Sequence, residues 1–125
     1  VAYTMAKYGM SLCVLGMAEE FKEQGVAVNA LWPRTAIATA AIKNALGGEA
    51  IMNISRSPEI MADAAHVMLT KPSKEFTGNF CIDDTILAEN GVTDFSVYAE
   101  VPFNELAPDF FVPEDDIPPK ASLDS

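Results

Sequence analysis

The pattern of hydrophobic and polar residues predicts a long helix followed by a buried strand. From Tyr3 to Gln24 the chain has helical character, with apolar residues on nearly every side of the helix until its charged last turns. Gly25 follows, at the position where glycine commonly ends a helix. The run Val26–Trp32 is continuously apolar, which is typical of a strand buried in a parallel sheet. Because a helix that is apolar on all sides is buried on more than one face, we expect more than the sheet to cover Tyr3–Gln24.

A second helix and a second strand follow in the middle of the chain. Ser57-Pro58-Glu59 has the composition of a helix start, and Lys71-Pro72 has that of a helix end. Phe76–Ile82 indicates the last strand. Because a strand–helix–strand unit forms a right-handed crossover between parallel strands, this strand should be a parallel neighbour of Val26–Trp32. One apolar stripe of the helix should pack on the sheet: Ile60, Met61, Ala64, Ala65, Met68 and Leu69.

Three shorter features have more than one interpretation. Ala40–Ser55 contains two helical pieces separated by Gly47-Gly48, and its apolar residues fit a lid over an apolar substrate as well as ordinary packing. Asp83-Asp84 can cap a helical turn at Thr85–Glu89, an interpretation that we prefer to a metal site. His66 is the one histidine in the sequence and falls on the polar side of its helix, so we expect a surface residue and no metal.

Composition and charge narrow the class of protein. The 125 residues, half of them hydrophobic, suffice for a core. Residues 1–91 carry ten acidic and seven basic side chains, whereas residues 92–125 carry eight acidic side chains and Lys120. This distribution contains no basic stripe for nucleic acid or for an anionic membrane surface. Cys13 and Cys81 lie in apolar runs without Cys-x-x-Cys spacing, which indicates buried free thiols in a reducing compartment.

The residues with the clearest chemical potential are Tyr3 and Lys7. They are four positions apart and therefore lie on one face of a helix. A fixed positive charge beside a phenol favours the phenolate, so the tyrosine can exchange a proton with an alcohol or carbonyl oxygen. The ammonium keeps further donors for a ribose or a phosphate. The same spacing arises by chance in many helices, so the pair carries little weight by itself.

The order of these features resembles the second half of a short-chain dehydrogenase/reductase. Tyr3-x-x-x-Lys7, a long buried helix, Gly25 and Val-Ala-Val-Asn-Ala-Leu-Trp-Pro match that family from Tyr3 to about Asp83. The resemblance implies an α/β fold, namely the C-terminal part of a Rossmann-type doubly wound parallel sheet with an irregular acidic tail. It assigns residues 1–91 to the C-terminal half of the Rossmann domain. The composition of the remaining residues predicts a packed irregular extension at 92–112 and a Pro- and acid-rich linker at 113–125.

The resemblance also implies an activity. It predicts an NAD(P)-dependent oxidoreductase that interconverts an alcohol and a carbonyl on an apolar, lipid- or steroid-like substrate, with NADP or NAD as the cofactor. Tyr3 would be the general acid/base at the reacting oxygen. Lys7 would activate Tyr3 and bind the nicotinamide ribose. The alternative is a non-catalytic or truncated relative that acts as a dimerisation or lipid-handling scaffold.

The cofactor contacts come from one motif of the resembled family and from the Tyr–Lys pair. The family has Pro-Gly-x-Val/Ile-x-Thr after the strand, whereas this chain has one additional residue and Arg34 in place of the glycine. With that departure, the residues predicted to contact the cofactor are Tyr3, Lys7, Pro33, Ile37 and Thr39.

Further expectations concern the intact protein. The sequence holds no Gly-x-Gly-x-x-Gly loop and its first residues belong to a helix. We therefore expect a piece of a longer chain that is inactive alone, with the glycine-rich loop and the catalytic serine and asparagine upstream. We expect a homo-oligomer formed through the Tyr3–Gln24 helix, and no membrane span. The resemblance implies an intracellular location, peroxisomal or mitochondrial.

Overall fold

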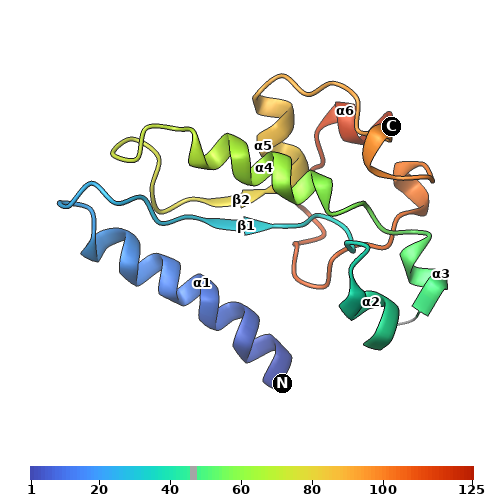
Figure 1. The fold of residues 1–125 in the computed structure, drawn as a ribbon, viewed down its shortest axis with the longest axis horizontal. Helices are drawn as coiled ribbons and strands as arrows, with labels where there is room; N and C mark the ends of the chain where they lie inside the picture. The colour runs from blue at the N-terminus through green and yellow to red at the C-terminus, as the bar shows by residue number, and fades with distance from the viewer. Residues whose placement is uncertain (46–47) are drawn as a thin grey trace.

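A short parallel sheet separates one long helix from two shorter ones (Figure 1). The computed structural model describes residues 1–45 and 48–125. Helix α1 lies on one face of the sheet, and α4 lies on the other face with α5 beside it (Figure 1). The described elements are, in chain order, α1 (Ala2–Glu20), β1 (Ala30–Trp32), α2 (Ala40–Ala45), α3 (Gly48–Met52), α4 (Glu59–Leu69), β2 (Phe80–Ile82), α5 (Asp83–Glu89), the 3₁₀ turns η1 (Ser96–Tyr98) and η2 (Phe103–Glu105), and α6 (Lys120–Leu123).

Strands β1 and β2 are parallel neighbours, as the sequence predicts. Their register places Leu31 opposite Cys81. Each strand covers the last three residues of its predicted run. Among the earlier residues, the Gly78 N–H donates to the Val28 carbonyl at 2.8 Å. Asn29 adds side-chain contacts there, since its Nδ2 donates to the Phe76 carbonyl and its Oδ1 accepts from the Asn79 N–H, each at 3.0 Å. The predicted crossover is therefore confirmed, with shorter strands.

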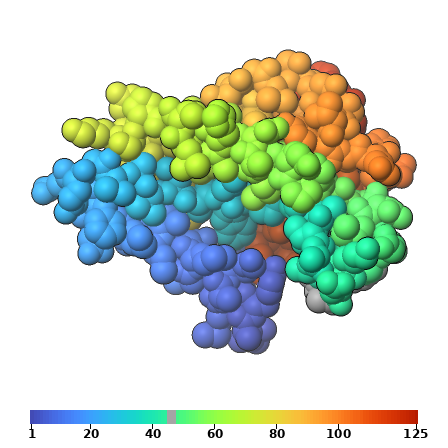
Figure 2. All heavy atoms as spheres, in the orientation of Figure 1, coloured from blue at the N-terminus to red at the C-terminus, as the bar shows by residue number. Residues whose placement is uncertain are grey.

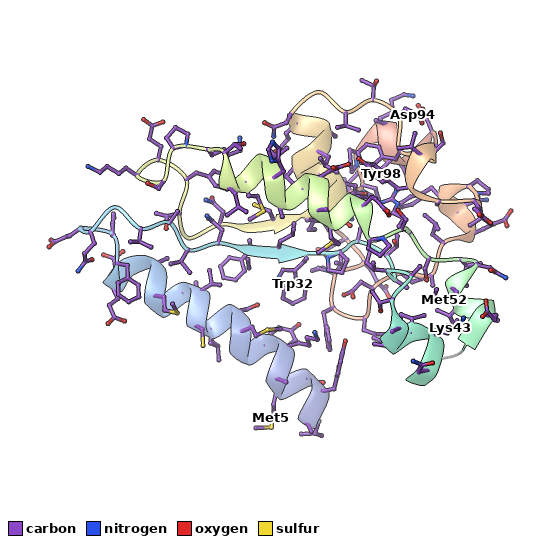
Figure 3. All side chains as sticks on the ribbon, in the orientation of Figure 1. Met5, Trp32, Lys43, Met52, Asp94 and Tyr98 are labelled. Carbon is purple, nitrogen blue, oxygen red and sulfur yellow. The ribbon has the colours of Figure 1, made fainter. Side chains whose placement is uncertain are left out.

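Helix α1 is shorter and more exposed than predicted. It ends at Glu20, and a turn leads to Gly25, whose φ of 71° is a conformation that glycine adopts without strain. Within the described residues, Ala18 is the only buried residue of α1, because the sheet contacts one side of the helix. Met5 points away from the sheet (Figure 3), and the helix protrudes from the body of the molecule (Figure 2). No helix in the described ranges is long and apolar enough to cross a membrane.

The hydrophobic core lies between α4, α5 and the segment that follows α5. Of the stripe predicted on α4, Ile60 and Ala64 are fully buried, whereas Leu69 is exposed because it is the last residue of the helix. The Tyr98 hydroxyl donates to Asp63 Oδ2 at 2.6 Å and so connects the irregular extension to α4. The buried apolar residues of this core are Ile60, Ala64, Ile86, Leu87, Phe95 and Tyr98.

The predictions for the two cysteines and the histidine have different outcomes. Cys13 is exposed, although the sequence predicts a buried thiol, because it lies on a side of α1 that the sheet does not cover. Cys81 is half-buried in β2, and burial raises the pKa of its thiol. Both cysteines are free, as predicted. His66 lies on the exposed side of α4, which confirms its predicted surface position.

The predicted lid region forms the short helices α2 and α3. Lys43 on α2 and Glu49 on α3 form an exposed ion pair of 3.0 Å. Met52 ends α3 and is half-buried (Figure 3). The predicted break at Gly47 and the predicted lid residue Leu46 lie outside the described residues.

The last thirteen residues, 113–125, differ from the solvated linker that the sequence predicts. They contain α6, on which Ser122 is fully buried. Asp116 Oδ1 accepts a hydrogen bond of 2.7 Å from Arg34 Nη2. Polar and charged groups hold this segment in place, so its Pro- and acid-rich composition gave no sign of the packing.

Candidate active site

Helix α1 places Tyr3 and Lys7 together, as their spacing predicts. The Lys7 Nζ lies 5.5 Å from the centroid of the Tyr3 ring, which is within the range of a cation–π contact. Lys7 is half-buried, whereas Tyr3 is 53% exposed and presents its ring to the space between α1 and β1. The pair therefore forms a phenol–ammonium unit at the side of a cavity.

That cavity has a volume of about 330 Å³ and lies between α1 and β1. Helix α1 supplies one wall, and the residues from Asn29 to Pro33 supply the opposite wall. The C-terminal extension closes one side with Asp109 and Phe111. The lining is mainly apolar and aromatic, so the few polar groups that face the space stand out: the Tyr3 hydroxyl, the Lys7 ammonium, and Ser11, Asn29 and Asp109.

An aromatic cluster centred on Phe111 forms the closed side of the cavity. The Phe111 ring is stacked on the Tyr3 ring, with centroids 5.9 Å apart and planes at 21°. Its edge contacts are with Tyr8 at 5.4 Å and Trp32 at 6.3 Å. Trp32 projects from β1 toward α1 (Figure 3). Sequence reasoning placed Phe111 in the general packing of the extension and missed its position beside Tyr3.

The loop after β1 brings one of its three predicted cofactor residues to this cavity. Pro33 lines the cavity with Tyr3 and Lys7. The Ile37 side chain packs against the hydrophobic core instead. Thr39 is exposed, and its carbonyl accepts from the Lys43 N–H at 3.0 Å in the first turn of α2. The side chains of Ile37 and Thr39 are therefore not gathered with the Tyr–Lys pair.

The backbone of Ile37 has a defined orientation relative to Arg56. Ile37 forms a parallel bridge with Arg56, in which the Arg56 N–H donates to the Ala36 carbonyl and the Arg56 carbonyl accepts from the Ala38 N–H. In this pattern the peptide groups of the middle residue, Ile37, point away from Arg56. The N–H and the carbonyl of Ile37 therefore make no hydrogen bond to Arg56.

Arg34 begins the loop and is held by the buried carboxylate of Asp84 and the partly exposed carboxylate of Asp116. Its Nε lies 2.7 and 2.8 Å from the two carboxylate oxygens of Asp84, and its Nη2 donates to Asp116 at 2.7 Å. Burial opposes the charge, but the bonds to Asp84 and Asp116 outweigh it and raise the pKa of the guanidinium. The Arg34 N–H also donates to Asp83 Oδ1 at 3.0 Å. Arg34 thus joins β1, α5 and the tail.

A second arginine completes the same network. Arg56 Nη1 lies 3.3 Å from Asp84 Oδ2, and Arg56 Nη2 donates to Ser122 Oγ at 2.6 Å. The Ser122 hydroxyl donates in turn to Asp84 Oδ2 at 2.7 Å. The Arg56 guanidinium also lies 5.5 Å from the rings of Phe95 and Phe103. We refer to Arg34, Arg56, Asp83, Asp84, Asp116 and Ser122 as the buried ion network.

The two adjacent aspartates form the start of α5 and do not cap it. Helix α5 begins at Asp83 and no side chain caps its first turn, so the predicted capping of a turn at Thr85–Glu89 is wrong. Asp83 Oδ1 accepts from the N–H of the next residue, Asp84, at 2.8 Å. Asp84 instead faces the two arginines. Burial raises the pKa of Asp83 to about 6, and its Oδ2 has no hydrogen-bond partner among the described residues. In the described ranges no group of three or more His, Cys, Asp or Glu side chains has the arrangement of a metal site.

Comparisons with known proteins support the predicted resemblance. No protein-family model matches the chain. Hydroxysteroid dehydrogenase-like protein 2 from Bos taurus is 60% identical over 113 residues, which are 90% of this chain and 26% of the relative. The chain thus spans about a quarter of the length of the curated relative it matches.

Two solved structures have the same fold. A candidate dehydrogenase from Xanthomonas campestris superposes with a TM-score of 0.81 at 55% identity, over 90% of this chain and 40% of the other. A short-chain dehydrogenase from Mycobacterium thermoresistibile superposes with a TM-score of 0.76 at 53% identity, over 94% of this chain and 43% of the other. The segments Ala2–Met10, Ala30–Ile37 and Pro108–Phe111 already suggest this likeness. The chain is therefore similar in sequence to hydroxysteroid dehydrogenase-like protein 2 and in fold to the short-chain dehydrogenases, which confirms the predicted resemblance.

Proposed function

We propose that the intact protein is an NAD(P)-dependent oxidoreductase that interconverts an alcohol and a carbonyl on an apolar, lipid- or steroid-like substrate. The observation that carries this proposal is the shared cavity of Tyr3, Lys7 and Pro33, which has a mainly apolar and aromatic lining. The similarity to dehydrogenases supports the reaction class. An apolar lining favours an apolar substrate because transfer of apolar surface from water is the main gain in binding.

Tyr3 is the proposed general acid/base. Its hydroxyl gives a proton to the substrate oxygen during reduction and takes it back during oxidation. The neighbouring Lys7 ammonium, 5.5 Å from the ring centroid, stabilises the phenolate that forms when the proton leaves. The partly open position of Tyr3 leaves its hydroxyl accessible to a substrate that enters the cavity.

The described residues fit a nicotinamide cofactor, NADP or NAD. When bound, the cofactor supplies or accepts the hydride. Lys7 keeps donors for the ribose hydroxyls, and Pro33 lines the cavity beside it. The peptide groups of Ile37, which face away from Arg56, are proposed to hold the nicotinamide carboxamide. The exposed hydroxyl of Thr39 is proposed to contact the pyrophosphate.

The test is Tyr3→Phe in the intact protein, assayed with a reducible apolar ketone and with NADPH or NADH. Turnover should fall by on the order of a hundredfold or more while cofactor binding is retained, because only the exchangeable proton is lost. Tyr8→Phe is a matched control, since Tyr8 shares the helix and the aromatic cluster but does not line the cavity. Unchanged turnover in Tyr3→Phe would remove Tyr3 from the mechanism.

A scaffold function is the second candidate, and the exposed apolar side chains of α1 favour it. Met5, Leu12 and Leu15 are 57 to 69% exposed. A homo-oligomer formed through this helix would cover them, and the same contact is compatible with an enzyme. A protein that associates through α1 but is unaffected by Tyr3→Phe would act as a scaffold.

A further inference from the structure

The C-terminal extension is fixed against the loop after β1 by main-chain hydrogen bonds. The Ala36 N–H donates to the Ala107 carbonyl at 2.8 Å, and the Asp109 N–H donates to the Arg34 carbonyl at 3.0 Å. Thr35 and Pro108 form the antiparallel bridge between these two contacts. The segment from Ala107 to Asp109 is therefore held like a short strand, which gives the next residues of the chain a fixed starting point.

A tight turn then directs the next aromatic residues to opposite sides. Asp109 Oδ2 accepts from the Phe111 N–H at 2.8 Å, which closes an Asx-type turn. Phe110 projects to solvent and is 75% exposed. Phe111 is half-buried and lines the cavity. The Phe111 ring therefore lies beside the Tyr–Lys pair, whereas the Phe110 ring lies at the surface.

The rings of Phe111 and Trp32 form an aromatic wall of the cavity that Tyr3 also lines. The Phe111 ring is stacked on the Tyr3 ring with planes at 21°, so it covers one face of the proposed acid/base. Trp32 meets Phe111 edge-on at 86° and bounds the same wall. A substrate whose oxygen bonds to the Tyr3 hydroxyl would lay the carbon skeleton next to that oxygen against these rings. A flat ring gains an offset or edge contact there, whereas a flexible chain gains less and loses more conformational freedom.

We propose that Phe111 is a specificity-determining residue, and that the site prefers ketones or alcohols whose reacting carbon belongs to a flat apolar ring over open-chain ones. This inference rests on the proposed function for the identity of the reacting group. Beyond that function, it specifies the preferred shape of the substrate. It also names a residue that determines this preference, Phe111, which lies outside α1.

The experiment compares two ketones of equal carbon number, the bicyclic α-tetralone and the linear decan-2-one, with the intact protein and its Phe111→Ala and Phe111→Leu variants. Both variants should lower kcat/KM for the bicyclic ketone by about tenfold and for the linear ketone by less than about threefold, because the aromatic contact is lost. Phe111→Tyr should retain the preference. Phe110→Ala is the matched control and should change neither value.

Calorimetric titration of the same proteins with α-tetralone separates this inference from the proposed reaction. If the protein binds the ketone without reducing it, the proposed reaction is wrong. In that case, about tenfold weaker binding of α-tetralone by Phe111→Ala still supports the contact between Phe111 and the substrate ring. Equal losses on both ketones, or no loss of kcat/KM and of affinity on removal of the ring, overturn the inference. A parent protein that binds neither ketone also overturns it.

Discussion

Arg34 connects the loop after β1 to α5 and to the C-terminal segment. The resembled family has glycine at this position, whereas Arg34 in this chain reaches Asp84 and Asp116 from inside the molecule. A buried guanidinium is tolerated only with partners, so the departure from glycine and the packing of the tail are parts of one arrangement. Arg34 therefore links the proposed cofactor loop to a segment more than eighty positions later in the chain, at Asp116.

Asp84 should matter most among the carboxylates of the buried ion network. It faces Arg34 and Arg56, whose side chains are 6% and 1% exposed. Its loss leaves the buried Arg56 without its carboxylate partner and leaves Arg34 with only the partly exposed Asp116. Asp84→Asn should lower the free energy of unfolding by about 3–5 kcal/mol. Asp116 has a side chain that is 38% exposed, and Asp116→Asn should cost less than about 1 kcal/mol. Urea unfolding of both variants measures the difference, and equal losses would contradict the ranking.

Asp83 should make the stability depend on pH in a defined direction. Its carboxyl has a pKa of about 6 in the folded protein, against 3.8 as the ordinary value, so the folded state holds the proton more tightly. The stabilisation is therefore fully present below about pH 4 and is lost as the pH rises through 6. The Asp83→Asn variant lacks this loss. Relative to the parent, it should gain about 2–3 kcal/mol in free energy of unfolding between pH 4 and pH 7.5. A difference that does not change with pH would contradict the prediction.

At the scale of elements, the order and pairing of the fold could be predicted, and the lengths and exposures could not. Apolar runs separated by a helix predict parallel neighbours, and β1 and β2 are parallel. Both strands are shorter than predicted, because Asn29 side-chain contacts and a backbone bond from Gly78 to Val28 join the residues before the regular ladder. The continuous apolar run Val26–Trp32 does not indicate where that ladder begins.

The expected association of subunits through helix α1 can be tested with one substitution. The apolar character of Tyr3–Gln24 on nearly every side predicts a surface for a second subunit around Met10, Val14 and Met17. Met10 and Val14, however, line the cavity. Leu12 is 66% exposed and lies on the opposite side of the helix. Leu12→Asp should therefore dissociate a homo-oligomer of the intact protein in sedimentation velocity, because an aspartate cannot be buried at an apolar contact without a partner.

The matched control is Val97→Asp, which places the same charge at a 70% exposed apolar residue outside α1. It should leave the association unchanged. Circular dichroism establishes that both variants are folded. A folded Leu12→Asp protein that sediments like the parent would show that α1 does not hold subunits together.

At the scale of the whole molecule, only the local half of the site could be predicted. Tyr3 and Lys7 are one helical turn apart, so the sequence alone brings them together. Phe111 is more than a hundred positions from Tyr3, and only the bonds of the extension to the loop after β1 place the two rings in contact. The buried ion network was missed for the same reason, since its carboxylates look like caps or solvated tail charges when they are considered singly.

The distribution of the site over the molecule leads to a prediction about the 125-residue chain by itself. Affinity for a dinucleotide comes largely from a glycine-rich turn and a helix N-terminus that hold the pyrophosphate. The sequence contains no Gly-x-Gly-x-x-Gly turn, although we propose that Lys7, Pro33 and Ile37 contact the nicotinamide end. Isothermal titration of the chain with NADPH or NADH should therefore detect no binding at micromolar concentrations, while the intact protein binds one of them. Micromolar binding by the chain alone would place the pyrophosphate contacts within these residues, and the exposed Thr39 at the start of α2 would then be the first side chain to replace.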